Sequence, residues 1–229
     1  MNLFEPKVLI FDLDDTLYDE LTFVKSGFAA VANYLASSFK INPTRAKDFM
    51  MCSLISDGRG NIFDKLLMTN GIYSKKTVHK CITVYRLHKP RLKLESSVPD
   101  LLKSLKQKYE LYLITDGNKI VQRNKIESLG LDIYFKKCFI THQYGVSKAK
   151  PSIYCFELIK KKENCSWNEM VYVGDNPNKD FINIKTKGVL TLRVLTGSYK
   201  SVKLSNKHEA LRSINEISDL RKILKLYEN

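Results

Sequence analysis

Four aspartates lie within eight residues of one another near the start of the chain, namely Asp12, Asp14, Asp15 and Asp19. They follow an apolar run, residues 8–11, that is typical of a buried strand. Carboxylates gathered at a strand end repel one another unless a cation or a raised pKa relieves the repulsion. Magnesium favours oxygen ligands and needs only one or two carboxylates besides water and phosphate oxygens. The spacing therefore predicts a magnesium site in this stretch.

Polar residues also follow the other predicted strands. They are Thr115, Asp116, Lys148, Asp175 and Asp180. The hydroxyl of Thr115 and the backbone amides after it, at a helix start, would form a cradle for phosphate. Lys148 would add positive charge to the same anion. Because ligands of open α/β sheets bind outside the carboxyl ends of the strands, this set indicates a phosphate site beside the metal.

The elements that must position these residues can be predicted from hydrophobic patterning. Short continuous apolar runs predict strands at residues 7–11, 110–114, 137–140, 170–173 and 189–194. Continuous runs are expected of parallel strands that are covered on both faces. Helical stretches separate the later runs, and residues 215–227 predict a closing amphipathic helix. This alternation predicts an α/β fold with a doubly wound parallel sheet.

One interval breaks the alternation of strands and helices. Residues 17–91 contain four helical stretches and no convincing strand, so we expect a helical domain inserted into a core formed by residues 1–16 and 92–229. Within the insertion, Arg59 lies in a turn between two glycines. Arginine suits forked recognition of a carboxylate or phosphate on a substrate. A surface turn residue is an equally good interpretation of Arg59.

These motifs together resemble the haloacid dehalogenase superfamily over nearly the whole chain. The matches are Asp12 to Thr16 for DxDxT, Thr115 for the second motif, Lys148 for the third, and Gly174, Asp175 and Asp180 for GDxxxxD. The resemblance implies a Rossmann-like core with a helical cap of the C1 type inserted after the first motif. The sequence after the second motif resembles the phosphatase branch in which Asp116 replaces a commoner asparagine.

The third motif departs from the family pattern. Members usually read KPDP where this chain reads Lys148-Ala149-Lys150-Pro151. Alignment through Pro151 favours Lys148 as the residue on the phosphate side. Lys150 is the alternative.

The resemblance also implies a reaction, the hydrolysis of a phosphomonoester through an aspartyl-phosphate. Asp12 would be the nucleophile and Asp14 the general acid and base. Magnesium would be held by Asp12, Asp14 and Asp175, with Asp180 in support. Thr115, Asp116 and Lys148 would bind the phosphoryl oxygens. The expected substrate is a small phosphorylated metabolite, a sugar phosphate or a nucleotide, and transfer to an acceptor other than water uses the same residues.

Composition leaves one alternative function open. The formal charge of +14 is carried mostly by dispersed lysines, which favours a solvated surface over a binding site for nucleic acid. A phosphatase-like fold that binds a polyanion, or a phosphatase acting on nucleic-acid ends, is the less favoured alternative. Five scattered cysteines, and no apolar run long enough to cross a membrane, predict a cytoplasmic protein without membrane contact. The sequence predicts no oligomeric state.

Overall fold

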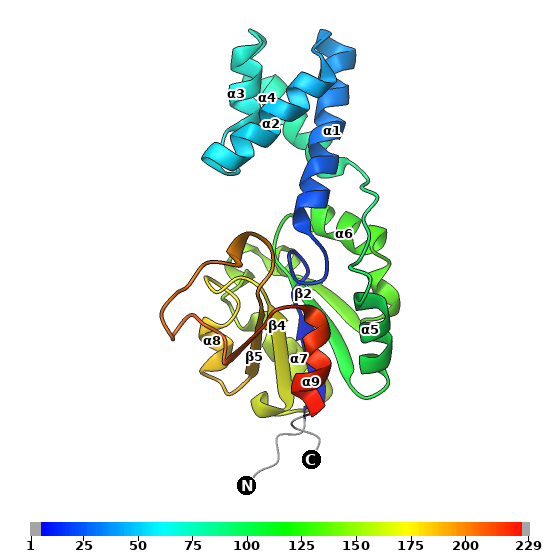
Figure 1. The fold of residues 1–229 in the computed structure, drawn as a ribbon, viewed down its shortest axis with the longest axis vertical. Coiled ribbons are helices and arrows are strands. Elements are labelled where there is room, and N and C mark those ends of the chain that lie inside the picture. Colours follow the sequence, from blue (N-terminus) through cyan, green and yellow to red (C-terminus); the bar gives the residue numbers. More distant parts are fainter. Residues whose placement is uncertain (1–5, 226–229) are drawn as a thin grey trace. The chain divides into compact units, whose positions relative to one another are not determined.

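A parallel sheet of six strands organises the larger of the two units into which the chain divides (Figure 1). The computed structural model describes residues 6–225, so the last two residues of the helix expected over 215–227 lie outside the described residues. The larger unit contains the described residues up to Glu20 and those from Lys93 onward. The smaller unit is Leu21–Leu92. The predicted helical insertion covers residues 17–91, whereas the smaller unit of the structure begins at Leu21 and ends at Leu92.

The strands have the order β3-β2-β1-β4-β5-β6. Their bounds are β1 Val8–Phe11, β2 Glu110–Thr115, β3 Lys137–Ile140, β4 Met170–Gly174, β5 Leu190–Val194 and β6 Arg212–Ile214. All four residues of β1, the central strand, are buried, as the continuous apolar run predicts. The predicted α/β class with a doubly wound parallel sheet is therefore confirmed.

Helices cover both faces of the sheet. They are α5 Val98–Lys106, α6 Lys119–Ser128, α7 Tyr154–Glu163, α8 Ile182–Lys185 and α9 Leu220–Lys225. Right-handed crossovers place α5 and α6 on one face and α7 and α8 on the other. Alternate residues of β1 serve the two faces: Val8 and Ile10 pack with Phe156 of α7, whereas Phe11 contacts Phe135 at a ring-centroid distance of 5.9 Å.

Two elements of this unit differ from the prediction. Strand β6 pairs in parallel with β5, where the sequence had indicated no strand. Two of its three residues are exposed, so it carries no apolar run by which the patterning could identify it. Of the helical stretches expected between the later strands, the one between β4 and β5 is only the short α8, because the chain before it forms turns around Asp180.

The smaller unit consists of helices, as the sequence predicted for this interval. They are α1 Glu20–Phe39, which starts at the last residue of the larger unit, α2 Pro43–Asp57, α3 Ile62–Thr69 and α4 Lys75–Leu87. Asn42 and Ser74 cap α2 and α4 by accepting hydrogen bonds from backbone N–H groups. A core of its own includes Phe28, Leu35 and Leu66. Across the described residues, no helix combines the length and apolar character needed to cross a bilayer.

Candidate active site

Asp12 and Asp175 come from neighbouring strands at the carboxyl edge of the sheet. Asp12 directly follows β1, and its backbone N–H donates to the carbonyl of Val173 in β4 at 2.8 Å. Asp175 directly follows β4. Together with Asp180, these residues offer three carboxylate oxygens that lie within 4.8 Å of one another. Strand order reverses direction at β1 and β4, which is where sheets of this kind bind ligands.

Lys150 joins two of these carboxylates. Its Nζ donates to Asp12 Oδ1 and to Asp180 Oδ1, both at 2.7 Å, and to the hydroxyl of Tyr172 at 2.9 Å. The lysine side chain is 1% exposed. Burial alone would lower the pKa of Lys150, but the carboxylates of Asp12 and Asp180 raise it well above its ordinary value. Lys150 is therefore a buried cation with fixed hydrogen-bond partners.

The same cluster fits the chemistry of a divalent metal. Burial, partly offset by Lys150, raises the pKa of Asp12 to about 7. Burial and the carboxylates of Asp12 and Asp180 raise the pKa of Asp175 to about 9. A hard cation such as Mg²⁺ would relieve this repulsion, since it prefers carboxylate and carbonyl oxygens. Asp12 and Asp175 are thus residues that could hold the metal.

Asp180 is placed by a close turn after β4. Its Oδ2 accepts a hydrogen bond from the backbone N–H of Asn176 at 2.9 Å, and its Oδ1 accepts from the hydroxyl of Tyr172 at 3.0 Å. A Cβ added to Gly174 would lie 2.6 Å from Asp180 Oδ2, so only glycine fits there. Because both oxygens of Asp180 are already bonded within the protein, the residue supports the cluster by positioning its members.

Asp14 lies in the loop after β1 and faces a different set of partners. Its Oδ1 accepts from the hydroxyl of Tyr18 at 2.6 Å and from Lys125 Nζ at 2.7 Å, and its Oδ2 accepts from Gln122 Nε2 at 2.9 Å. Burial alone would raise the pKa of Asp14, but the charge and hydrogen bond of Lys125 lower it. The carboxylate is therefore held in place by three donors.

Thr115 and Asp116 lie where the second motif was predicted. Thr115 ends β2, and its buried Oγ1 accepts a hydrogen bond from Gln122. The carboxylate of Asp116 accepts from Thr141 Oγ1 at 2.7 Å, from the Lys150 backbone N–H at 3.0 Å and from Lys179 Nζ at 3.0 Å. This network fixes the backbone between β2 and α6, where we expect backbone amides to meet phosphate oxygens.

The two candidate lysines of the third motif are clearly distinguished. Lys148 ends a short 3₁₀ turn, and its Nζ lies 4.7 Å from the ring centroid of Tyr154. Lys150, two residues later, is the one paired with Asp12. The structure therefore brings Lys150, the alternative, and not Lys148 to the buried edge of the sheet, and which of the two lysines contacts phosphate stays a prediction.

Arg59 belongs to the helical unit. It lines a pocket of about 280 Å³ together with apolar side chains that include Phe28, Phe63 and Tyr85. A role in substrate binding for Arg59 stays a prediction.

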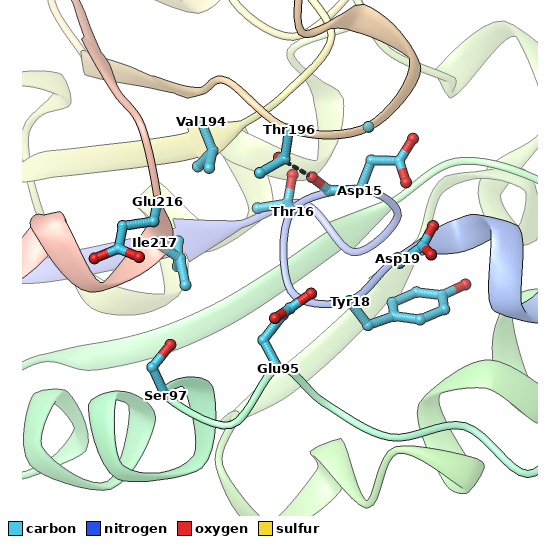
Figure 2. A pocket seen from close by; sticks show the side chains of 11 residues that line it. Asp15, Thr16, Tyr18, Asp19, Glu95, Ser97, Val194, Thr196, Glu216 and Ile217 are labelled. Carbon is cyan, nitrogen blue, oxygen red and sulfur yellow. Dashed lines mark hydrogen bonds between the residues drawn. The ribbon is translucent and has the colours of Figure 1, made fainter.

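Asp15 has a structural role beside the site. Its backbone φ is +55°, and its carboxylate accepts hydrogen bonds from the N–H groups of Glu20 at 3.0 Å and Ser198 at 3.2 Å. Its carbonyl accepts a hydrogen bond from Thr196 Oγ1, which Figure 2 shows as a dashed line. A neighbouring pocket of about 260 Å³ is lined by Asp15 but not by Asp12 or Asp175. Asp15 thus joins the loop after β1 to the loop after β5.

Three residues near the candidate site were not predicted from the sequence. They are Gln122, Lys125 and Lys179. Gln122 and Lys125 follow the second motif, and their three-residue spacing puts both on one face of α6. No sequence pattern distinguishes Lys179 from the many other lysines of the chain, so its place at the site could not be predicted.

This fold and this carboxylate cluster define a class of protein. Residues 9–194 match the model of the haloacid dehalogenase-like hydrolases, and the chain belongs to this family. The predicted superfamily and its Rossmann-like architecture are therefore confirmed.

Relatives with assigned names are similar over most of the chain. Glyceraldehyde 3-phosphate phosphatase of Methanocaldococcus jannaschii is 30% identical over 228 residues, which cover 96% of this chain and 98% of the relative. N-acylneuraminate-9-phosphatase of Rattus norvegicus is 24% identical over 198 residues, covering 79% and 78%. The predicted phosphatase class is confirmed by such relatives.

Solved structures show the same fold. The HAD hydrolase YfnB from Bacillus subtilis bound to magnesium matches with a TM-score of 0.68 and 19% identity, over 96% of this chain and 99% of that chain. At this level of identity the likeness establishes the architecture.

Proposed function

We propose that the protein is a magnesium-dependent phosphomonoesterase acting on a small phosphorylated metabolite through an aspartyl-phosphate on Asp12. The observation that carries the proposal is the placement of Asp12 at the end of β1, paired with Lys150 at 2.7 Å and grouped with Asp175 and Asp180. One oxygen of this carboxylate, Oδ1, accepts a hydrogen bond from the Lys150 ammonium, which fixes the orientation of the side chain. That arrangement suits a nucleophile facing a phosphoryl group.

Each step has a residue to perform it. Asp12 would attack phosphorus in line with the leaving oxygen. Asp14, which would first have to take up a proton, would give that proton to the leaving oxygen and later accept one from the attacking water. Thr115 and the backbone amide of Asp116 would donate hydrogen bonds to the phosphoryl oxygens. Lys150 keeps the Asp12 carboxylate oriented throughout.

The metal would add charge compensation to this arrangement. Asp12, the backbone carbonyl of Asp14, and Asp175 would hold Mg²⁺, which when bound offsets the negative charge of the carboxylates and the phosphoryl group. Asp180 would keep its present hydrogen bonds to Lys150 and to the Asn176 N–H, and so maintain the spacing of the ligands.

The relatives narrow the substrate class. One relative is named for glyceraldehyde 3-phosphate and another for an acylneuraminate 9-phosphate, both phosphate esters of a sugar or sugar-like hydroxyl. We therefore favour a sugar phosphate or triose phosphate over a nucleotide. The helical unit, Leu21–Leu92, is the part of the chain that we expect to determine this choice.

A phosphate-release screen tests the proposal. Purified protein is assayed with Mg²⁺ against triose, hexose and acylated amino-sugar phosphates and nucleotides, with EDTA and Asp12→Asn as controls. We expect release from at least one sugar phosphate, abolished by either control. Equal release by Asp12→Asn would exclude Asp12 as the nucleophile, and no release from any ester would refute the function.

A further inference from the structure

Helix α6 presents two buried polar side chains to the site. Gln122 and Lys125 are each 2% exposed and lie three residues apart, hence on one face of the helix. Asn118 starts the helix by accepting hydrogen bonds from the N–H groups of Ile120 and Val121, which fixes where that face points. Burying an amide and an ammonium is costly unless each finds specific partners. Their partners are residues of the proposed reaction.

The side-chain amide of Gln122 donates hydrogen bonds to two residues of the proposed reaction, Asp14 and Thr115. Its Nε2 donates to Asp14 Oδ2 at 2.9 Å and to Thr115 Oγ1 at 2.5 Å. An ionised carboxylate can only accept, so the amide nitrogen must face Asp14. The Thr115 oxygen then uses a lone pair to accept from the same nitrogen. Its own hydrogen is thereby left to donate to another group, and the phosphoryl oxygen expected beside Thr115 is such a group.

Lys125 contacts Asp14 through the other carboxylate oxygen. Its Nζ lies 2.7 Å from Asp14 Oδ1 and 3.1 Å from Glu20 Oε1, and the side chain is 3% exposed. The hydroxyl of Tyr18 donates to the same Asp14 oxygen at 2.6 Å. Lys125 thus helps to fix the rotation of the Asp14 carboxylate through Oδ1, whereas Gln122 contacts Oδ2.

We infer that Gln122 and Lys125 are positioning residues with separable roles: Gln122 orients both the phosphate-binding hydroxyl of Thr115 and the carboxylate of Asp14, whereas Lys125 orients the carboxylate of Asp14. This inference rests on the proposed function, because it assigns the two residues to Thr115 and Asp14 in that reaction. It predicts two different defects when each residue is replaced.

The first defect concerns the leaving group. A poor leaving group such as an alkoxide needs the proton from Asp14, whereas p-nitrophenolate leaves with little assistance. Loss of Asp14 orientation should therefore reduce kcat/KM for an alkyl phosphate much more than for p-nitrophenyl phosphate. The second defect concerns phosphate itself. Loss of the Thr115 donor should weaken the binding of inorganic phosphate, whatever the leaving group.

Three methionine variants separate these defects. Gln122→Met and Lys125→Met keep an unbranched side chain but remove the donors, and Arg123→Met removes a cation from the same helix. Arg123 is a suitable control because its partner at 3.3 Å is the exposed Asp132, away from the site. Each variant is assayed with glycerol phosphate and p-nitrophenyl phosphate, and its affinity for inorganic phosphate in Mg²⁺ buffer is measured by calorimetry.

For Lys125→Met we expect the alkyl-to-aryl ratio of kcat/KM to fall by about tenfold or more, with phosphate affinity within about threefold of wild type. For Gln122→Met we expect the same fall in ratio together with phosphate binding weakened by about fivefold to tenfold. Arg123→Met should leave both readouts unchanged. Equal loss on both esters in Lys125→Met, or unchanged phosphate affinity in Gln122→Met, would overturn the inference.

The variant Lys125→Arg and the phosphate-binding measurement keep the inference testable if a methionine variant does not fold or if no hydrolysis is detected. If Lys125→Met does not fold, Lys125→Arg keeps the cation, and we expect it to retain the wild-type ratio; a ratio that falls tenfold would overturn the role of Lys125. If the wild-type protein releases phosphate from no ester of the wider screen, the proposed function fails. Phosphate binding then decides the inference, and equal affinity in wild type and Gln122→Met, or no binding by either, would overturn it.

Discussion

Replacing Lys150 with methionine should destabilise the protein far more than the same change at Lys148. Lys150 Nζ makes two ion pairs of 2.7 Å and a hydrogen bond to Tyr172, and its side chain is 1% exposed. Removing one partner of a buried ion pair leaves an uncompensated charge and costs about 3–5 kcal/mol. For a chain of this length, that loss lowers Tm by roughly 10 °C. The variant should also lose phosphatase activity, because Asp12 would no longer be oriented.

Lys148→Met is the matched control. Its ammonium lies over the Tyr154 ring at 4.7 Å, an interaction worth at most about 1 kcal/mol near a surface. Chemical denaturation and phosphate release are measured for both variants with and without Mg²⁺. If Lys148→Met lost as much stability and activity as Lys150→Met, the assignment of Lys150 as the buried partner of Asp12 would be wrong.

Three further predictions concern Asp175 and the residues around it. Gly174→Ala should cost about 1–3 kcal/mol in denaturant unfolding, because its Cβ would lie 2.6 Å from Asp180 Oδ2; a neutral effect would contradict this close approach. Arg193→Leu should cost about 3 kcal/mol, since the buried guanidinium pairs with Glu209 and donates to the Asp175 carbonyl at 3.2 Å. The third outcome concerns pH: the folded-state pKa of Asp175, about 9, lies above its unfolded value, so the stability that this group contributes at low pH is lost as pH rises toward 9. In EDTA, Tm between pH 6 and pH 9 should therefore fall more steeply for wild type than for Asp175→Asn.

The sequence predicted the sheet and the first and fourth motifs because each has a strong local signal. Asp12 and Asp175 each end a continuous apolar run, and parallel strands bring such ends to one edge. The same reasoning could not choose between Lys148 and Lys150. That choice depends on the turn between β3 and α7, where no hydrophobic periodicity exists and the two lysines differ by only two positions.

Hydrophobic patterning also could not predict which polar side chains are buried. Hydrophobic patterning alone would assign the polar residues Gln122 and Lys125 to the solvent-facing side of a helix. Both are buried, because their side of α6 contacts Asp14 and Thr115. A hydrophobic-moment argument assigns polar residues to solvent, and only the tertiary structure shows that another polar cluster takes the place of water. Strand β6 was not predicted for a related reason, since two of its three residues are exposed and it contains no apolar run.

Charge balance at the sheet edge leads to a last prediction. Asp12, Asp116, Asp175 and Asp180 interact with two ammonium groups, those of Lys150 and Lys179. The excess of two negative charges equals the charge of one divalent cation. Burial and mutual repulsion raise the pKa of Asp12 to about 7 and that of Asp175 to about 9. Without metal, protons bound to these carboxyl groups can therefore balance the excess negative charge.

Magnesium binding should therefore displace protons from the protein. At pH 7, Asp175 would be protonated before the ion binds and Asp12 about half protonated, so we expect between about one and two protons released per Mg²⁺. Calorimetric titration in buffers of different ionisation enthalpy measures this number directly. Asp175→Asn should lower it by about one, whereas Asp132→Asn, which changes an exposed carboxylate, should leave it unchanged. Binding of Mg²⁺ without proton release would mean that the carboxylates are already ionised, and that Lys150 and Lys179 alone are enough to hold them so.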